Sequence, residues 1–125
     1  MTTTTLPALI QQFFTDRLSS QMEASPNTVA SYRDTFRMLL RFASERIRTM
    51  PTKLKIEDLD VTLVEEFLVH VETRRRNSAR SRNARLAAIR SFFRFVTMQE
   101  PAYMLHCQRI LAMPGKRYVR RTMEC

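Results

Sequence analysis

Arginine is the residue whose spacing in this sequence has the clearest chemical meaning. Between Thr73 and Gln99 there are eight arginines and no aspartate or glutamate. Surface helices usually mix both signs, because opposite charges four residues apart stabilise a helix and like charges repel. An unbroken run of cations is therefore unfavourable in the free chain and indicates an anionic partner. The eight residues are Arg74, Arg75, Arg76, Arg80, Arg82, Arg85, Arg90 and Arg94.

The predominance of arginine over lysine narrows the chemistry of that partner. The chain holds 18 arginines and 3 lysines, and its net charge is +9 at pH 7. A planar guanidinium can donate two parallel hydrogen bonds to a phosphate or to the edge of a guanine. We therefore expect double-stranded DNA to be the partner, and no small-molecule substrate.

Short polar side chains stand among these arginines. Ser31, Ser78, Ser81 and Asn83 can reach a phosphate or a base edge. Ser78 also suits the N-cap of a helix, so the sequence leaves its role open. Asn83 has little helix propensity and can pair with adenine through two hydrogen bonds, which favours a DNA contact.

Other kinds of chemistry lack the residues they need. With Gly115 as its single glycine, the chain cannot build the loops that hold nucleotide phosphates. His70 and His106 have no Asp or Ser at a relay spacing, and the neighbours His106 and Cys107 point in different directions on a helix. We therefore expect no catalytic residue, no metal and no cofactor in this chain.

Nothing in the sequence predicts export or membrane insertion. There is no secretion signal and no apolar run of the roughly 20 residues that a membrane span needs. The two cysteines, Cys107 and Cys125, are too few for a disulfide framework. We expect a soluble cytoplasmic protein, associated with the nucleoid when it binds DNA, with no disulfide and no membrane partner.

The elements that position the arginines are predicted to be helices. Apolar residues recur three and four positions apart in five segments, and no segment alternates as a strand does. The predicted fold class is all-α, a compact bundle of four to five helices at residues 6–22, 28–48, 63–75, 78–98 and 102–112. We expect a helical DNA-binding domain at 1–113 and a basic linker or tail, containing Lys116 and Arg117, at 114–125.

An apolar stripe on each helix is expected to form the core. The stripe of the second helix ends at Ile47, and that of the fifth includes Leu105. Basic rows run beside the stripes of the second and fourth helices, and we expect both rows to face outward toward the same polyanion. The rows are Arg33, Arg37, Arg41 and Arg48 on the second helix, and Arg80, Asn83, Ala87, Arg90 and Arg94 on the fourth.

Two sequence runs resemble a known family. The run 28–34, Thr-Val-Ala-Ser-Tyr-Arg-Asp, followed by Leu-Leu-Arg-Phe at 39–42, resembles the second helix of the N-terminal core-binding, SAM-like domain of tyrosine recombinases and integrases. The run 78–95 is still closer to the fourth helix of that domain. The resemblance covers about residues 6–121.

The resemblance implies half of a C-shaped clamp around duplex DNA. The second and fourth helices of such domains face the major groove, while the first and fifth meet neighbouring recombinase protomers. Carried over by position, the loop lysines Lys53 and Lys55 would lie near the DNA backbone. The helical residues implied to face DNA are Thr28, Ser31, Arg33, Ser81, Asn83, Arg85 and Arg90.

The catalytic part of the family pattern is absent from this chain. The family uses a cluster of arginines, a lysine and a histidine together with a tyrosine nucleophile, and none of Tyr32, Tyr103 and Tyr118 stands in that order. We expect this chain to bind DNA for recombination and integration without cutting it. The alternative hypothesis is a helical interaction module that docks an acidic protein partner; a helix-turn-helix regulator and a membrane-surface role fit less well.

Overall fold

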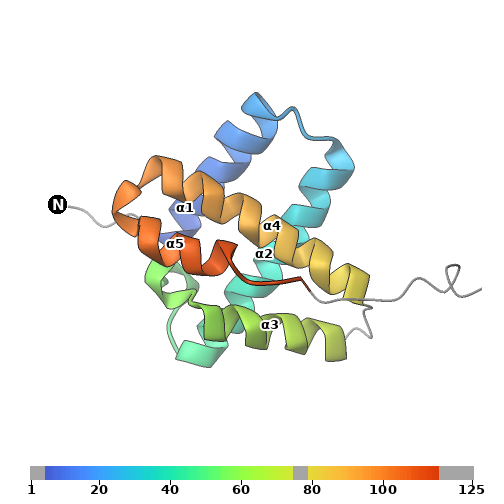
Figure 1. The fold of residues 1–125 in the computed structure, drawn as a ribbon, viewed down its shortest axis with the longest axis vertical. Coiled ribbons are helices and arrows are strands. Elements are labelled where there is room, and N and C mark those ends of the chain that lie inside the picture. The colour runs from blue at the N-terminus through green and yellow to red at the C-terminus, as the bar shows by residue number, and fades with distance from the viewer. Residues whose placement is uncertain (1–4, 75–78, 116–125) are drawn as a thin grey trace, which may run out of the picture.

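The computed structural model describes residues 5–74 and 79–115, and the regular elements within these ranges are all helices, with no strand (Figure 1). This confirms the predicted all-α class. The main helices are α1 (Leu6–Gln12), the π-helix η1 (Phe13–Gln21), α2 (Pro26–Ile47), α3 (Val61–Arg74), α4 (Ala79–Gln99) and α5 (Met104–Leu111). Three short 3₁₀ turns connect them, namely η2 (Pro51–Lys53), η3 (Ile56–Asp58) and η4 (Pro101–Tyr103).

Side-chain oxygens fix where the helices begin. The hydroxyl of Thr5 accepts a hydrogen bond from the N–H of Ala8 at the start of α1 (3.3 Å). Ser25 does the same for Thr28 at the start of α2 (3.2 Å), and Pro26 occupies the first helical position. Each oxygen satisfies a backbone donor that the first turn of a helix leaves without a partner.

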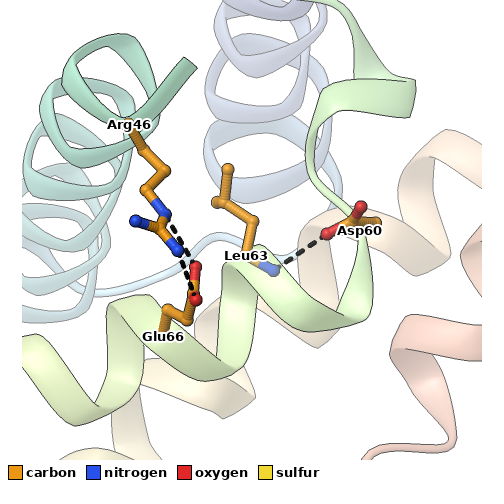
Figure 2. Close-up of polar contacts among 4 residues, drawn as sticks. All are labelled: Arg46, Asp60, Leu63 and Glu66. Atoms are coloured by element: carbon orange, nitrogen blue, oxygen red, sulfur yellow. Dashed lines mark hydrogen bonds and ion pairs between the residues drawn. The ribbon is translucent and has the colours of Figure 1, made fainter.

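Asp60 caps α3. Its carboxylate accepts a hydrogen bond from the N–H of Leu63 at 2.8 Å (Figure 2). Both Asp60 and Thr62 have an oxygen side chain suited to capping a helix, and in the structure Asp60 is the residue that caps. At the end of α2, Arg48 adopts a left-handed conformation with φ of 61°, and its N–H donates to the carbonyl of Ser44.

The first predicted helix differs from expectation, because it is not α-helical along its whole length. After Gln12 the chain widens into a π-helix, and the N–H of Met22 bonds to the carbonyl of Arg17, five residues earlier. Phe13 and Leu18, also five residues apart, are both completely buried. Hydrogen bonds between residues i and i+5 bring such a pair onto the same face, which a regular α-helix would not do.

Aromatic rings from three elements form the centre of the core. Phe13 of η1 packs against Phe36 of α2 and Phe92 of α4, with ring centroids 6.0 and 5.6 Å apart. Phe36 and Phe92 also meet directly, at 5.3 Å. These contacts hold α4 across η1 and α2, while α3 and α5 pack against other parts of α4 (Figure 1).

The central position of α4 explains where the predicted core was incomplete. The apolar stripe expected on this helix is fully buried, and so are Ala88 and Phe95, which lie outside the stripe. The stripe consists of Leu86, Ile89, Phe92, Phe93 and Val96. Neighbours on several sides cover more of the helix than one apolar stripe indicates. The opposite error occurs at the periphery, where Leu105 is 65% exposed and Ile47 is 37% exposed. Both were expected to be inside.

Candidate nucleic-acid interface

The five arginines that the structure describes on α4 fall into two groups. Arg80 and Arg94 are exposed. Arg82, Arg85 and Arg90 are half-buried, and each has one guanidinium nitrogen that is buried without a hydrogen-bond partner in the described part of the chain. The predicted row of outward cations is therefore reduced to the two exposed residues, and the half-buried Arg90 lies next to Arg94 on the helix surface.

The exposed arginines share one face of α4 with two small residues. At 100° per residue, Arg80, Ala84, Ala87 and Arg94 lie within a sector of about 80°, and all four are exposed. Arg80 and Arg94 are 14 residues apart, which is about 21 Å along the axis. We call these four residues the α4 face. The alanines leave room for a phosphate backbone to approach the helix closely.

Arg85 does not point outward as its place in the sequence had implied. Its side chain is only 15% exposed. Nη1 donates a hydrogen bond to the hydroxyl of Thr35 on α2 at 3.0 Å and lies 3.6 Å from the carboxylate of Asp34. The Thr35 side chain is 1% exposed, and its hydroxyl donates in turn to the carbonyl of Ser31 at 3.1 Å. Arg85 therefore joins α4 to α2, and a carboxylate lies beside it.

The contact with Arg85 shows which flank of α2 faces α4. Ser31 lies one turn before Thr35 on this flank, and Thr28 lies a further turn back. Ser31 is exposed, whereas Thr28 is half-buried and its hydroxyl accepts a hydrogen bond from the Ser25 hydroxyl at 3.0 Å. We call Thr28 and Ser31, together with Thr35, the α2 flank.

The basic row of α2 lies elsewhere. Arg33 and Arg37 are each about 160° around the helix from Thr35, and Arg41 is about 120° from it. Arg33 and Arg37 instead border a hollow beside α1, with the Arg33 guanidinium carbon 6.0 Å from the Phe14 ring centroid. The expectation that both rows form one outward face is therefore wrong: α2 and α4 are in contact, but their exposed arginines diverge.

The remaining predicted site residues are distributed as follows. Asn83 is half-buried, and a Cβ on Gly115 would lie 3.3 Å from its Oδ1, so the segment after α5 passes beside it. Ser81 is also half-buried. Lys53 and Lys55 are exposed on either side of Leu54, whose carbonyl accepts from the N–H of Leu6 at 2.9 Å. Ser78, Lys116 and Arg117 lie outside the described residues.

Two polar contacts between helices were not foreseen from the sequence. One is the bond between Arg85 and Thr35. The other is the pair of Arg46 and Glu66, in which Nε lies 2.9 Å from Oε1 and Nη2 lies 2.6 Å from Oε2 (Figure 2). A threonine beside an apolar stripe was the available signal for the first contact. For the second, nothing in the local sequence links positions 20 residues apart.

The two histidines and Cys107 each make a contact with a neighbouring residue in the described part of the chain. His106 Nε2 lies 2.8 Å from the carbonyl of Leu59, and the exposed ring of His70 packs on Phe42 at 5.1 Å. Burial raises the pKa of the Cys107 thiol, and a hydrogen bond with Thr97 opposes this in part. Over residues 5–74 and 79–115, no three His, Cys, Asp or Glu side chains are placed to hold a metal ion. In the same ranges, no helix is both long enough and apolar enough to cross a membrane.

Comparisons with known proteins agree with the resemblance seen in the sequence. A family model described as "Phage integrase, N-terminal SAM-like domain" matches residues 10–100. A Sinorhizobium fredii (strain NBRC 101917 / NGR234) protein named "Putative integrase/recombinase y4rC" is 48% identical over 115 residues, which are 92% of this chain and 35% of that protein. Another from the same strain, "Putative integrase/recombinase y4rD", is 47% identical over 112 residues, 90% of this chain and 40% of that protein.

The matches cover most of this chain but only part of each relative. This chain spans less than half the length of either curated relative. No solved structure matches it. The expected resemblance to the N-terminal domain of integrases is confirmed.

Proposed function

We propose that this chain, which belongs to the family of phage integrase N-terminal SAM-like domains, binds duplex DNA through the α4 face and the adjoining α2 flank. Family membership supports a role in DNA recombination. The finer assignment, which helices and which residues meet the DNA, rests on the geometry of the described residues.

The observation that carries the proposal is the α4 face itself. Arg80 and Arg94 are exposed on one side of α4, and α4 contains no carboxylate. Two cations about 21 Å apart, with small alanines between them, suit an extended polyanion better than a compact anion. Duplex DNA presents phosphates at regular intervals over this length, so both arginines can pair with phosphates at the same time.

We assign different roles to the neighbouring residues. Ser31, at the exposed end of the α2 flank, is positioned to donate to a phosphate or a base edge. Arg85 is a positioning residue, because its bond to Thr35 sets how α2 lies against α4. Arg90 is about 40° around the helix from Arg94, so its half-buried guanidinium can add charge beside the α4 face. Arg33 and Arg37 are left out of the DNA interface.

The chemistry of strand cleavage is assigned to residues other than these. The chain spans 35% and 40% of the two curated relatives, and we propose that the remaining part of such proteins supplies the catalytic groups. Residues 1–113 would then form the helical DNA-binding domain and residues 114–125 a linker. Other copies bound to the same DNA are the expected protein partners.

The proposal is tested by measuring the binding of a fluorescent duplex at several salt concentrations. Each phosphate contacted is expected to lower the logarithm of the association constant by roughly 0.9 per tenfold increase in salt. Polyglutamate serves as a control polyanion of flexible shape. Affinity that is independent of salt, or equal affinity for polyglutamate and duplex, would refute an interface built for DNA.

A further inference from the structure

A hollow of about 440 Å³ lies between the first helical segment and α2, away from the α4 face. Ile10 and Phe14 line it from α1 and η1, while Phe36 and Leu40 line it from α2. Arg33 and Arg37 stand at its edge. Gln11 and Thr15 complete the lining. The surface is therefore mostly apolar, with two arginines beside it, and we call it the α1–α2 hollow.

The mixed chemistry of this hollow argues against a phosphate as its occupant. A phosphate would engage Arg33 and Arg37 and leave the rings and aliphatic side chains in contact with water. A helix carrying both a carboxylate and an apolar side chain would use both parts, because it buries apolar area and pairs with the cations. The chemistry that fits is thus an acidic, amphipathic helix.

The same chain presents such a helix. On α3, Glu65 and Val69 are exposed and stand four residues apart, so they are neighbours on one ridge. Val69 is 57% exposed, which is unusual for a valine in a helix whose other face is buried. Arg33 and Arg37 have the same four-residue spacing. Both pairs therefore extend about 6 Å along their helices.

The two surfaces belong to different elements: α1, η1 and α2 form the hollow, and α3 carries the ridge. Figure 1 shows α3 at the bottom and the π-helical segment, which follows α1, at the top. The contact must therefore be between copies. We propose that the α1–α2 hollow of one copy accepts the Glu65–Val69 ridge of α3 from a second copy, with Arg37 and Arg33 facing Glu65. Such a contact is head-to-tail, because the two partners use different surfaces.

The small size of the hollow sets the expected strength. A contact confined to a hollow of this size belongs to the weak class of protein–protein interfaces. The bound state of such a contact becomes populated when two copies are held near one another. The inference names a surface for the proposed assembly with other copies, but it does not depend on DNA binding. Its test uses the chain without DNA, so failure of this contact and failure of DNA binding can be told apart.

The experiment is sedimentation equilibrium of the free chain at concentrations up to about 1 mM. We expect weak self-association, and we expect Arg37→Glu and Glu65→Arg each to lower the association constant at least about fivefold. A mixture of the two variants should recover association, because each supplies the surface that the other lacks. Circular dichroism establishes that both variants are folded.

The matched controls are Arg41→Glu and Glu45→Arg, which change charge equally on exposed positions of α2 outside the hollow. Both controls should associate as the unsubstituted chain does. A chain that stays monomeric at about 1 mM would overturn the inference. Equal losses of self-association for Arg41→Glu and Arg37→Glu would also overturn it. The same holds for an Arg37→Glu variant that self-associates normally but binds duplex weakly, because Arg37 would then contact DNA.

Discussion

The guanidinium of Arg85 on α4 donates a hydrogen bond to the hydroxyl of Thr35 on α2 at 3.0 Å. The threonine is buried, and its hydroxyl donates a hydrogen bond to the carbonyl of Ser31. One arginine of the basic helix thereby joins α4 to α2. Arg85 therefore contributes to the site mainly by positioning α2 against α4.

Replacing Thr35 by valine should destabilise the fold. The substitution keeps the size of the side chain but removes the acceptor, so a largely buried guanidinium loses its partner. We expect the free energy of unfolding in urea to fall by about 1–3 kcal/mol. Thr35→Ser keeps the hydroxyl and should lose less. Equal stability of the valine variant and the unsubstituted chain would show that the bond contributes nothing.

Arg85→Ala and Arg80→Ala should differ in their effect on the free energy of unfolding. Arg85→Ala removes a partly buried group and leaves the Thr35 hydroxyl without its donor, so it should lower the free energy of unfolding by at least about 1 kcal/mol. Arg80 is exposed, and its loss should change stability by no more than about 0.5 kcal/mol. Urea titrations of the two variants make the comparison, and a stable Arg85→Ala variant would contradict the positioning role.

The ion pair of Arg46 and Glu66 should contribute little to the free energy of unfolding, although its geometry is bidentate. Both side chains are substantially exposed, at 57% and 38%. Solvent screens such pairs, so a double-mutant cycle with Arg46→Ala and Glu66→Ala should give a coupling energy of about 0.2–1 kcal/mol. The coupling should shrink as salt is added. A coupling that is large and insensitive to salt would contradict this.

Alkaline pH should weaken the fold through Cys107. Burial raises the pKa of its thiol above the ordinary value of 9.0, so the folded state favours the protonated form. This stabilisation is fully present below pH 9 and is lost as the pH rises through the folded-state pKa. In a Cys125→Ser background, the free energy of unfolding should therefore fall above pH 9, and Cys107→Ala should make the fall smaller.

Tyr103 acts in the same direction at higher pH. Its pKa is raised above 10.0 by desolvation first, and then by the charges of Glu57 and Glu100. Tyr103→Phe should remove this part of the alkaline destabilisation. If both substitutions leave the pH profile unchanged, neither group is linked to stability as described.

The helices were predictable because their apolar stripes and caps are local features. The inward residues of α3 and α4, the cap at Ser25 and the order of the helices all follow from patterns within a few positions. The π-helix was missed because its wide turns depend on both Phe13 and Leu18 reaching the core. Leu105 was misplaced because α5 is short and its neighbours, which decide what it buries, are not encoded in its own spacing.

The candidate site was harder to predict than the fold. Periodicity placed Arg85 among outward cations, yet a threonine 50 positions away holds it inward. Periodicity also placed Arg33 and Arg37 on a ridge but could not say which neighbour lies beside that ridge. Helix-to-helix contacts set both outcomes, and a single sequence does not specify the rotation of one helix against another.

The most direct test of the central claim compares two double variants that remove the same charge. Arg80→Ala/Arg94→Ala alters the α4 face, whereas Arg41→Ala/Arg109→Ala removes two arginines that are also exposed but lie outside that face. For the first we predict weaker duplex binding and a salt slope that is shallower by about 1.8, from two lost phosphate contacts. The second should bind with nearly the original slope and affinity. Identical losses in the two variants would mean that net charge, and not the α4 face, accounts for DNA binding.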